Sequence, residues 1–372
     1  MINARFRSFK AFGVAVFKSL APGDISIAFP LFFHNRKKNR LEESGFKCIM
    51  KGGKNCPHIG AGKETKIMEI VLLKQICIMF LLIVVGMALV KTGYLSDQGA
   101  KDLGALLLRA VIPCVVIRSY ITEFSVGRLM EQAESMLLTV LSLLIAMAVS
   151  YLVFGTRRRI ENVAAAFSNV GFIGIPLIQS ILGEEAIFYL TPLIAVLNIL
   201  QWTYGVYIMT GDPKTIQIKT ILSNPVVLAL VAGFLIFVLQ IPVPSVISGA
   251  LGHMASMNTP LAMIILGTYV AQMNWRELLL TKSAYLCSLV RLVLIPAVTL
   301  LIFCLIPGIK TDIKLVILIA GSTPVGANIA IFAKQYGGDY KLSVVTVCLS
   351  TLACIVTVPV FYMFVERFLL SI

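Results

Sequence analysis

From residue 70 onward the sequence is a series of apolar runs of roughly 20 residues, separated by short polar loops. An α-helix of this length crosses the hydrocarbon core of a bilayer, which is about 30 Å thick. Charged residues make up only 13% of the chain, whereas soluble domains contain about 25%. We therefore predict an all-α polytopic membrane protein. Ten spans are expected, at residues 70–90, 102–122, 134–154, 161–182, 186–209, 220–240, 248–271, 280–306, 313–335 and 342–369.

The first 67 residues differ from the rest of the chain. They contain 13 Lys and Arg residues but only 4 Asp and Glu residues. Their apolar part is interrupted by Lys18, Asp24 and two prolines, which opposes a stable span. A new hydrophobic pattern starts at Met68. We interpret residues 1–67 as a basic extension that is not part of the mature fold, either a translated leader ahead of a start at Met68 or an unusual presequence.

The sequence lacks the usual signatures of enzymes and metal sites. It has no CxxC, HExxH, GxSxG or phosphate-binding glycine loop. Cys48, Cys56 and His58 fit no common zinc spacing. The other six cysteines lie in apolar runs, where a thiol acts as a small apolar group: Cys77, Cys114, Cys287, Cys304, Cys348 and Cys354. We predict neither an enzyme nor a protein with a metal or another cofactor, and no nucleic-acid partner.

The basic residues of the loops predict the orientation, because loops rich in Lys and Arg stay cytoplasmic. With ten spans, one side collects eleven basic residues, including the Arg157–Arg159 run, and the other side collects five. We therefore place the Arg157–Arg159 loop in the cytoplasm. An even number of spans then puts both termini of a chain starting at Met68 outside the cell, in the plasma membrane.

An internal repeat becomes visible when the chain is shifted by 155 residues. SNVGFI, at residues 168–173, then lies over TPVGAN, at residues 323–328. The matched segments are five predicted spans apart, and because five is odd the second half must be inverted relative to the first. We therefore predict two inverted five-helix repeats, at residues 68–210 and 211–372.

Both matched segments interrupt an apolar run with Gly, Pro and Asn, residues that weaken a helix interior. Unwound backbone in a membrane persists only where protein buries it or it lines a wet cavity. We expect such a cavity, with second half-helices that start near Gly174 and Asn328 and attract an anion by their N-terminal ends. The alternative is a proline kink that only shapes packing. The candidate binding residues are Asn169, Thr323 and Asn328, with Gly171, Gly174, Pro176, Pro324 and Gly326 shaping the backbone.

Two arginines and one asparagine within the predicted spans are further candidates. Arg109 and Arg291 each precede a proline, and a guanidinium suits a substrate carboxylate. The alternative is that each pairs with a backbone carbonyl or extends to the membrane surface. Asn198 lies with Gln201 and Tyr204 on one helical face, which either lines the cavity or forms hydrogen bonds between helices.

Several motifs resemble the auxin efflux carrier family of membrane transporters, in its bacterial branch. They are GMALVKTGYLS, IPCVVIRSY, FSNVGFIGIP with LIQSILGEEA, AVLNILQWTYG, and the segment from STPVGAN to CIVTVPV. The likeness runs from about Met68 to the C-terminus. It implies ten helices in two inverted repeats, with helices 4 and 9 broken and crossing at Asn169–Pro176 and Thr323–Asn328.

The resemblance also implies a function. Relatives are thought to work as elevators, and bacterial members are linked to mono- and dicarboxylates such as malate and malonate. The plant members form homodimers, so a homodimer is one state that the resemblance allows. We predict a secondary transporter for a small organic anion. The alternatives are a sodium-coupled organic-anion symporter of related fold and a membrane receptor that binds a ligand without moving it.

Overall fold

The computed structural model describes residues 61–273 and 275–370, and every regular element in them is a helix. The predicted N-terminal extension lies outside the described residues, apart from residues 61–67, which begin the first helix. Six helical runs of the described part are long and apolar enough to cross a membrane, at Leu73–Lys91, Val126–Phe154, Glu184–Thr210, Ser245–Gln272, Lys282–Cys304 and Tyr340–Val365. Val170–Leu182 and Pro225–Leu239 are shorter apolar helices. The ten-span count, the inverted repeat and the division at residue 210 stay predictions.

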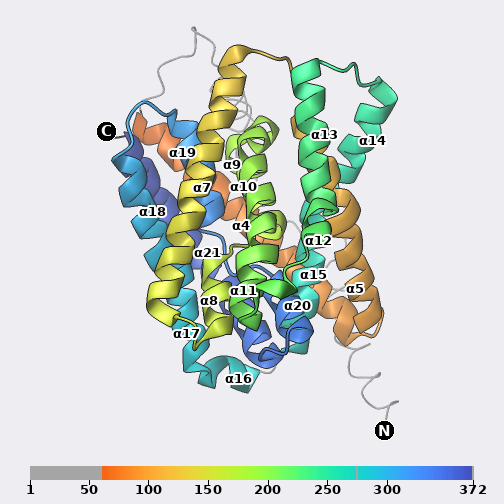
Figure 1. The fold of residues 1–372 in the computed structure, drawn as a ribbon, viewed down its shortest axis with the longest axis vertical. Helices are drawn as coiled ribbons and strands as arrows, with labels where there is room; N and C mark the ends of the chain where they lie inside the picture. The colour runs from red at the N-terminus through yellow and green to blue at the C-terminus, as the bar shows by residue number, and fades with distance from the viewer. Residues whose placement is uncertain (1–60, 274, 371–372) are drawn as a thin grey trace, which may run out of the picture. The chain divides into compact units, whose positions relative to one another are not determined.

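The elements follow one another with short connections (Figure 1). Up to residue 210 they are α4 (Ala61–Lys91), α5 (Asp97–Leu106), η1 (Leu107–Val111), α6 (Ile112–Ser119), α7 (Val126–Phe154), α8 (Arg159–Ala166), η2 (Val170–Gly174), α9 (Ile175–Leu182), η3 (Glu184–Ala186), α10 (Ile187–Leu200), η4 (Gln201–Gly205) and α11 (Val206–Thr210). The remainder are η5 (Pro213–Thr215), α12 (Ile218–Leu222), α13 (Pro225–Leu239), α14 (Ser245–Ser256), α15 (Asn258–Gln272), α16 (Trp275–Leu280), α17 (Lys282–Leu289), η6 (Val290–Leu294), α18 (Ile295–Cys304), α19 (Thr311–Gly321), α20 (Asn328–Gln335) and α21 (Tyr340–Leu370).

Three Ile-Pro pairs inside long helical runs follow a π-helical turn. Pro113, Pro176 and Pro296 come directly after η1, η2 and η6. Proline lacks an N–H and its ring collides with the carbonyl four residues earlier, so a wider turn relieves the collision and lets the helix continue. Pro176 therefore does not begin a half-helix. The second half-helix is predicted near Gly174, and its α-helical part, α9, begins at Ile175, while the π turn η2 extends the helical run back to Val170.

One group of helices packs around α4 and α6. Helix α4 lies along α15, and α6 contacts both α13 and α14. The approach of α4 to α15 is close because both carry glycine at the contact. A Cβ atom on Gly86 would lie 2.2 Å from the carbonyl oxygen of Ile264, and a Cβ on Gly267 would lie 2.2 Å from that of Ile83. Small residues allow such backbone contact between membrane helices.

A second group packs around α7 and α21. Helix α7 contacts α8, α10, α18 and α19, and Figure 1 shows α10 beside α7. Helix α21 contacts α17, α19 and α20. The interrupted helices belong to this group, since α7 contacts α8 and α19, and α21 contacts α20. Helix α8 stops at Ala166 before η2, and α19 stops at Gly321 before α20. The structure thus contains an interruption at each of the two matched sequence segments.

Candidate functional site

The two interruptions pair directly with each other. Ser168 and Val325 form an isolated antiparallel bridge. The backbone N–H of Asn169 donates to the carbonyl of Pro324 at 2.8 Å, and the N–H of Gly326 donates to the carbonyl of Phe167 at 3.0 Å. Backbone groups released from two helices therefore satisfy one another, as a water-free interior requires. We call this pair of segments, residues 167–169 and 322–327, the crossover.

Arg291 holds the ends of both first half-helices. Its Nε donates to the carbonyl of Thr323 at 3.1 Å, and one of its Nη2 hydrogens reaches the carbonyl of Gly321, at the end of α19. Its Nη1 donates to the carbonyls of Ala165 and Ala166, at 3.0 and 3.3 Å, at the end of α8. The guanidinium is buried, and its charge stabilises two helix C-termini, which carry partial negative charge.

This arrangement matches the alternative role that the sequence left open for Arg291, a cation paired with backbone carbonyls. Four hydrogen bonds to protein leave its guanidinium one further N–H for a ligand. Arg109, the other arginine candidate, is exposed on η1 and does not line the cavity at the crossover. The structure therefore assigns neither arginine a direct contact with a ligand at this cavity.

Two further polar side chains satisfy the crossover backbone. Ser350 on α21 accepts a hydrogen bond from the N–H of Val325 at 3.2 Å. Asn258, at the start of α15, donates its Nδ2 to the carbonyl of Gly171 at 3.3 Å. Neither residue is among the candidates drawn from the sequence. For Ser350, a polar residue inside an apolar run was the available signal.

A small cavity of about 40 Å³ lies beside the crossover. Its polar lining consists of Ser168, Asn169, Asn198, Gln201 and Asn328, with the backbone of Gly171 and Gly326. Asp and Glu are absent from this lining. Across the described residues, no group of three or more His, Cys, Asp or Glu side chains is placed to hold a metal ion. The cavity is thus a neutral polar site rich in amide groups.

Asn169 is the cavity residue with an unused donor. Its side chain is 4% exposed, and its Nδ2 has no hydrogen-bond partner. By contrast, the Nδ2 of Asn328 donates to the Oε1 of Gln201 at 3.1 Å, and the Nδ2 of Asn198 donates to the carbonyl of Ile194 in its own helix at 2.7 Å. A buried donor without a partner is costly, so the Asn169 amide is suited to an acceptor atom of a ligand.

The helix starts beside the cavity contribute positive potential. The run from Val170 to Leu182 and helix α20 both begin at the crossover. The first N–H groups of a helix carry partial positive charge, although in α20 those of Ile329 and Ala330 already donate to the carbonyls of Gly326 and Ala327. This potential favours an anion beside Asn169 and Asn328.

The remaining candidate residues shape the crossover, and of these Gly171 and Gly326 also line the cavity. A Cβ atom on Gly171 would lie 2.9 Å from the Cδ1 of Ile112, and a Cβ on Gly174 would lie 3.2 Å from the Cγ1 of Val170. Thr323 is fully buried and its Oγ1 donates to the carbonyl of Ala320 at 2.7 Å. Pro324 supplies the carbonyl that accepts from Asn169, as described above. Pro176 lines a different, larger cavity.

The family model described as membrane transport protein matches residues 71–362, a range that includes both interruptions. The chain belongs to this family, the auxin efflux carrier family. A search of curated proteins finds no match to the chain. Membership confirms the resemblance drawn from the sequence motifs. Together with the apolar helices, it identifies the chain as a multi-pass membrane transporter.

Proposed function

We propose that this transporter moves a small organic anion, a mono- or dicarboxylate, which binds at the crossover. The observation that carries the proposal is the buried, unpartnered Nδ2 of Asn169. A carboxylate oxygen is a strong acceptor for such a donor, and bonds to a charged acceptor are stronger than neutral ones. The adjacent helix starts, at Val170 and Asn328, favour the same charge.

The neutral lining also bears on the choice between anion and cation. A dehydrated cation would need carboxylate or several carbonyl ligands, and the cavity lining contains no Asp or Glu. A sodium-coupled symporter, the alternative within transport, would place such ligands at the helix breaks. We therefore favour transport in which the crossover binds the anion itself.

Movement of the substrate requires the two helix groups to shift relative to each other. The cavity is lined by Ile112 and Val226 from the group of α6 and α13, and by Asn169 and Asn328 from the group that contains the crossover. Its volume of about 40 Å³ suffices for about three water molecules. A carboxylate needs more room, so the groups must separate to admit it. Elevator-type sliding of the crossover group along the other group meets this requirement.

We also propose that the transporter lies in the plasma membrane with the Arg157–Arg159 loop in the cytoplasm and both termini outside. An impermeant maleimide would test this orientation in intact cells. A cysteine replacing Glu123, in the loop after α6, should react from outside. A cysteine replacing Arg158 should react only after permeabilisation, and the reverse pattern would invert the assignment. Homodimer formation stays open.

Counterflow in proteoliposomes tests the transport function. Vesicles containing the full chain are loaded with unlabelled malonate, and labelled malonate is added outside, with acetate and malate as parallel substrates. Transient accumulation of label, independent of a sodium gradient, is the expected result. Dependence on sodium would favour the symporter. Saturable binding of a carboxylate without counterflow would favour a receptor and contradict the proposal.

A further inference from the structure

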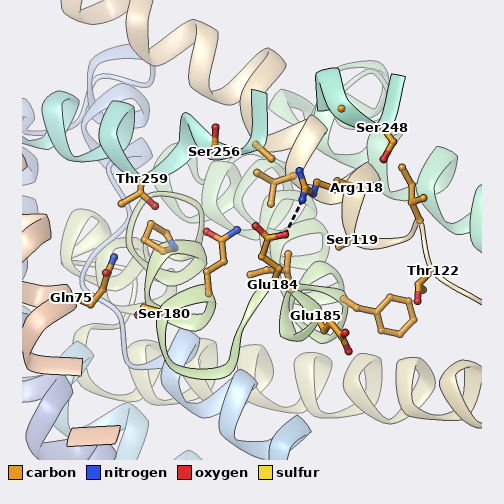
Figure 2. A pocket seen from close by; sticks show the side chains of 18 of the residues that line it. Gln75, Arg118, Ser119, Thr122, Ser180, Glu184, Glu185, Ser248, Ser256 and Thr259 are labelled. Atoms are coloured by element: carbon orange, nitrogen blue, oxygen red, sulfur yellow. Dashed lines mark hydrogen bonds and ion pairs between the residues drawn. The ribbon is translucent and has the colours of Figure 1, made fainter. Parts of the chain in front are cut away.

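A second, much larger cavity lies beside α9, the later part of the broken helix. Its volume is about 730 Å³, within the usual size range of small-molecule sites. It shares no lining residue with the small cavity at the crossover, yet Pro176, Gln179 and Ser180 of α9 line it. We call this larger cavity the vestibule. Its charged lining residues are Arg118, Arg128, Glu184 and Glu185, and Figure 2 shows Arg118, Glu184 and Glu185 at the cavity.

One ion pair connects α6 with the segment that follows α9 across the vestibule. The Nη2 of Arg118, on α6, lies 2.9 Å from the Oε2 of Glu184, which follows the end of α9, and Figure 2 shows the two side chains directed at each other. The Arg118 side chain is 40% exposed and the Glu184 side chain is 69% exposed. Ion pairs this accessible to water contribute little to stability. Another carboxylate can therefore replace Glu184 at small cost.

The position of the Arg118 guanidinium depends on a glycine in the facing helix. A Cβ atom on Gly252 of α14 would lie 1.9 Å from the Nη1 of Arg118. Any larger residue there would push the guanidinium away from this place. The close fit orients the planar group, which can hold a carboxylate through two parallel hydrogen bonds.

A second pair of charges in the vestibule provides a natural comparison. Arg128 donates a hydrogen bond to Thr122, and its Nη2 lies 3.9 Å from the Oε2 of Glu185, whose side chain is 92% exposed. This pair is longer and its carboxylate is more exposed than that of the Arg118–Glu184 pair, while the Arg128 side chain is 36% exposed, close to the 40% of Arg118. Arg118 is therefore the better-placed cation of the vestibule.

We propose that Arg118 is an anion-binding residue of the vestibule, where a small carboxylate displaces Glu184 from its guanidinium before reaching the crossover. The proposal rests on the function proposed above. Glu184 is then a competing internal carboxylate, which keeps the site weak enough to release its ligand. Pro176 and Gln179, on the helix that leads back to the crossover, line the same space.

Protection from chemical labelling tests binding separately from transport. A cysteine replacing Ser248, which lines the vestibule near Arg118, is labelled with maleimide in the purified full chain, and labelling at this position is quantified by mass spectrometry. Sodium malonate should slow the reaction, whereas sodium chloride at equal ionic strength should not. Arg118→Gln should abolish the protection by malonate. Absence of protection in the parent chain, equal protection by chloride, or protection that survives Arg118→Gln would overturn the proposal.

Transport kinetics then distinguish the two proposals. Arg118→Gln should raise the KM for malonate counterflow by about tenfold with little change in maximal rate, since one charged hydrogen-bond partner is lost. Glu184→Gln should lower the KM, and the matched variant Glu185→Gln, which removes the same charge from the same cavity but not from Arg118, should lower it less. Gly252→Ala, which displaces the guanidinium without removing its charge, should raise the KM. An unchanged KM in Arg118→Gln would refute the vestibule site alone, whereas absent counterflow in the parent chain with intact protection would refute only the transport function.

Discussion

The two interruptions of the crossover have similar sequences but different hydrogen bonding. Arg291 binds carbonyls beside both, those of Ala165 and Ala166 at the first and those of Gly321 and Thr323 at the second. In the second, Ser350 also accepts from Val325. In the first, the backbone is paired, but the side chain of Asn169 is buried with an unused donor. The same pattern of glycine and proline therefore marks both interruptions in the sequence. They differ in whether their buried polar groups have hydrogen-bond partners within the protein.

This difference assigns different tasks to the two segments. At the second interruption, protein groups satisfy the polar groups named above. We call the two side chains that do so, those of Arg291 and Ser350, the frame. The first is the side that a ligand can complete. Substitutions that remove the frame should cost stability, whereas substitutions at the open donor should cost transport with little loss of stability.

The largest expected effect is on the frame. Replacing Arg291 by Ala leaves the carbonyls of Ala165, Ala166, Gly321 and Thr323 without their cation. Each buried carbonyl that is left without a partner costs about 1 to 3 kcal/mol, so the detergent-solubilised protein should unfold at a much lower temperature. Arg291→Lys, which keeps the charge but not the fork of donors, should be intermediate. A thermal unfolding midpoint for Arg291→Ala equal to that of the parent would contradict this role.

The next effect concerns the open donor. Asn169→Ala removes an amide that bonds to no protein group through its Nδ2, so the unfolding midpoint should change little. Malonate counterflow should fall at least about tenfold, the factor expected for one lost charge-assisted bond. The matched control is Asn198→Ala, since the Asn198 amide is bonded within its own helix. Equal losses of transport in Asn169→Ala and Asn198→Ala would show that the unpartnered amide of Asn169 has no special role in substrate binding.

A smaller effect is expected at the partner of Val325. Ser350→Ala leaves a buried N–H unpaired, which costs about 1 to 2 kcal/mol. The neighbouring Thr351 is a control, because its buried Oγ1 has no hydrogen-bond partner. Thr351→Val should therefore preserve the unfolding midpoint that Ser350→Ala lowers. If both variants are as stable as the parent, Ser350 does not support the crossover.

The smallest effect is expected outside both regions. Arg109 is exposed and lines neither cavity. Arg109→Gln should leave the malonate KM and maximal rate within about twofold of the parent, a range that corresponds to less than 1 kcal/mol. A larger loss of transport would show that Arg109 contributes to substrate binding.

The sequence predicted the interruptions because Gly, Pro and Asn are conspicuous within apolar runs. It placed the second half-helices near Gly174 and Asn328, and α9 and α20 begin at Ile175 and Asn328. It could not predict the π turn before Pro176, which extends the first of these helical runs back to Val170. Arg291 was left with a backbone carbonyl as one of its possible partners, but the sequence could not identify which carbonyls it binds. Its carbonyl partners at Ala165 and Ala166 are more than a hundred residues away in the chain, and only the packing of α8 against η6 brings them together.

The candidate site was predicted in part. Asn169 and Asn328 line the cavity as expected, and Gln201 and Asn198 lie with them. The sequence could not distinguish an amide that is satisfied by the protein from one that is not, because this depends on distances of a few tenths of an ångström. The vestibule was missed since its residues come from eight separate elements, each with an ordinary polar pattern.

The most direct test of the central claim is malonate counterflow by Asn169→Asp. This change keeps the size and shape of the side chain but replaces the donor amide with a carboxylate, which repels an anion. If the open donor at the crossover binds the substrate, counterflow should fall below about a tenth of the parent rate while the protein still inserts and unfolds as the parent does. Counterflow at the parent rate would show that the substrate binds elsewhere.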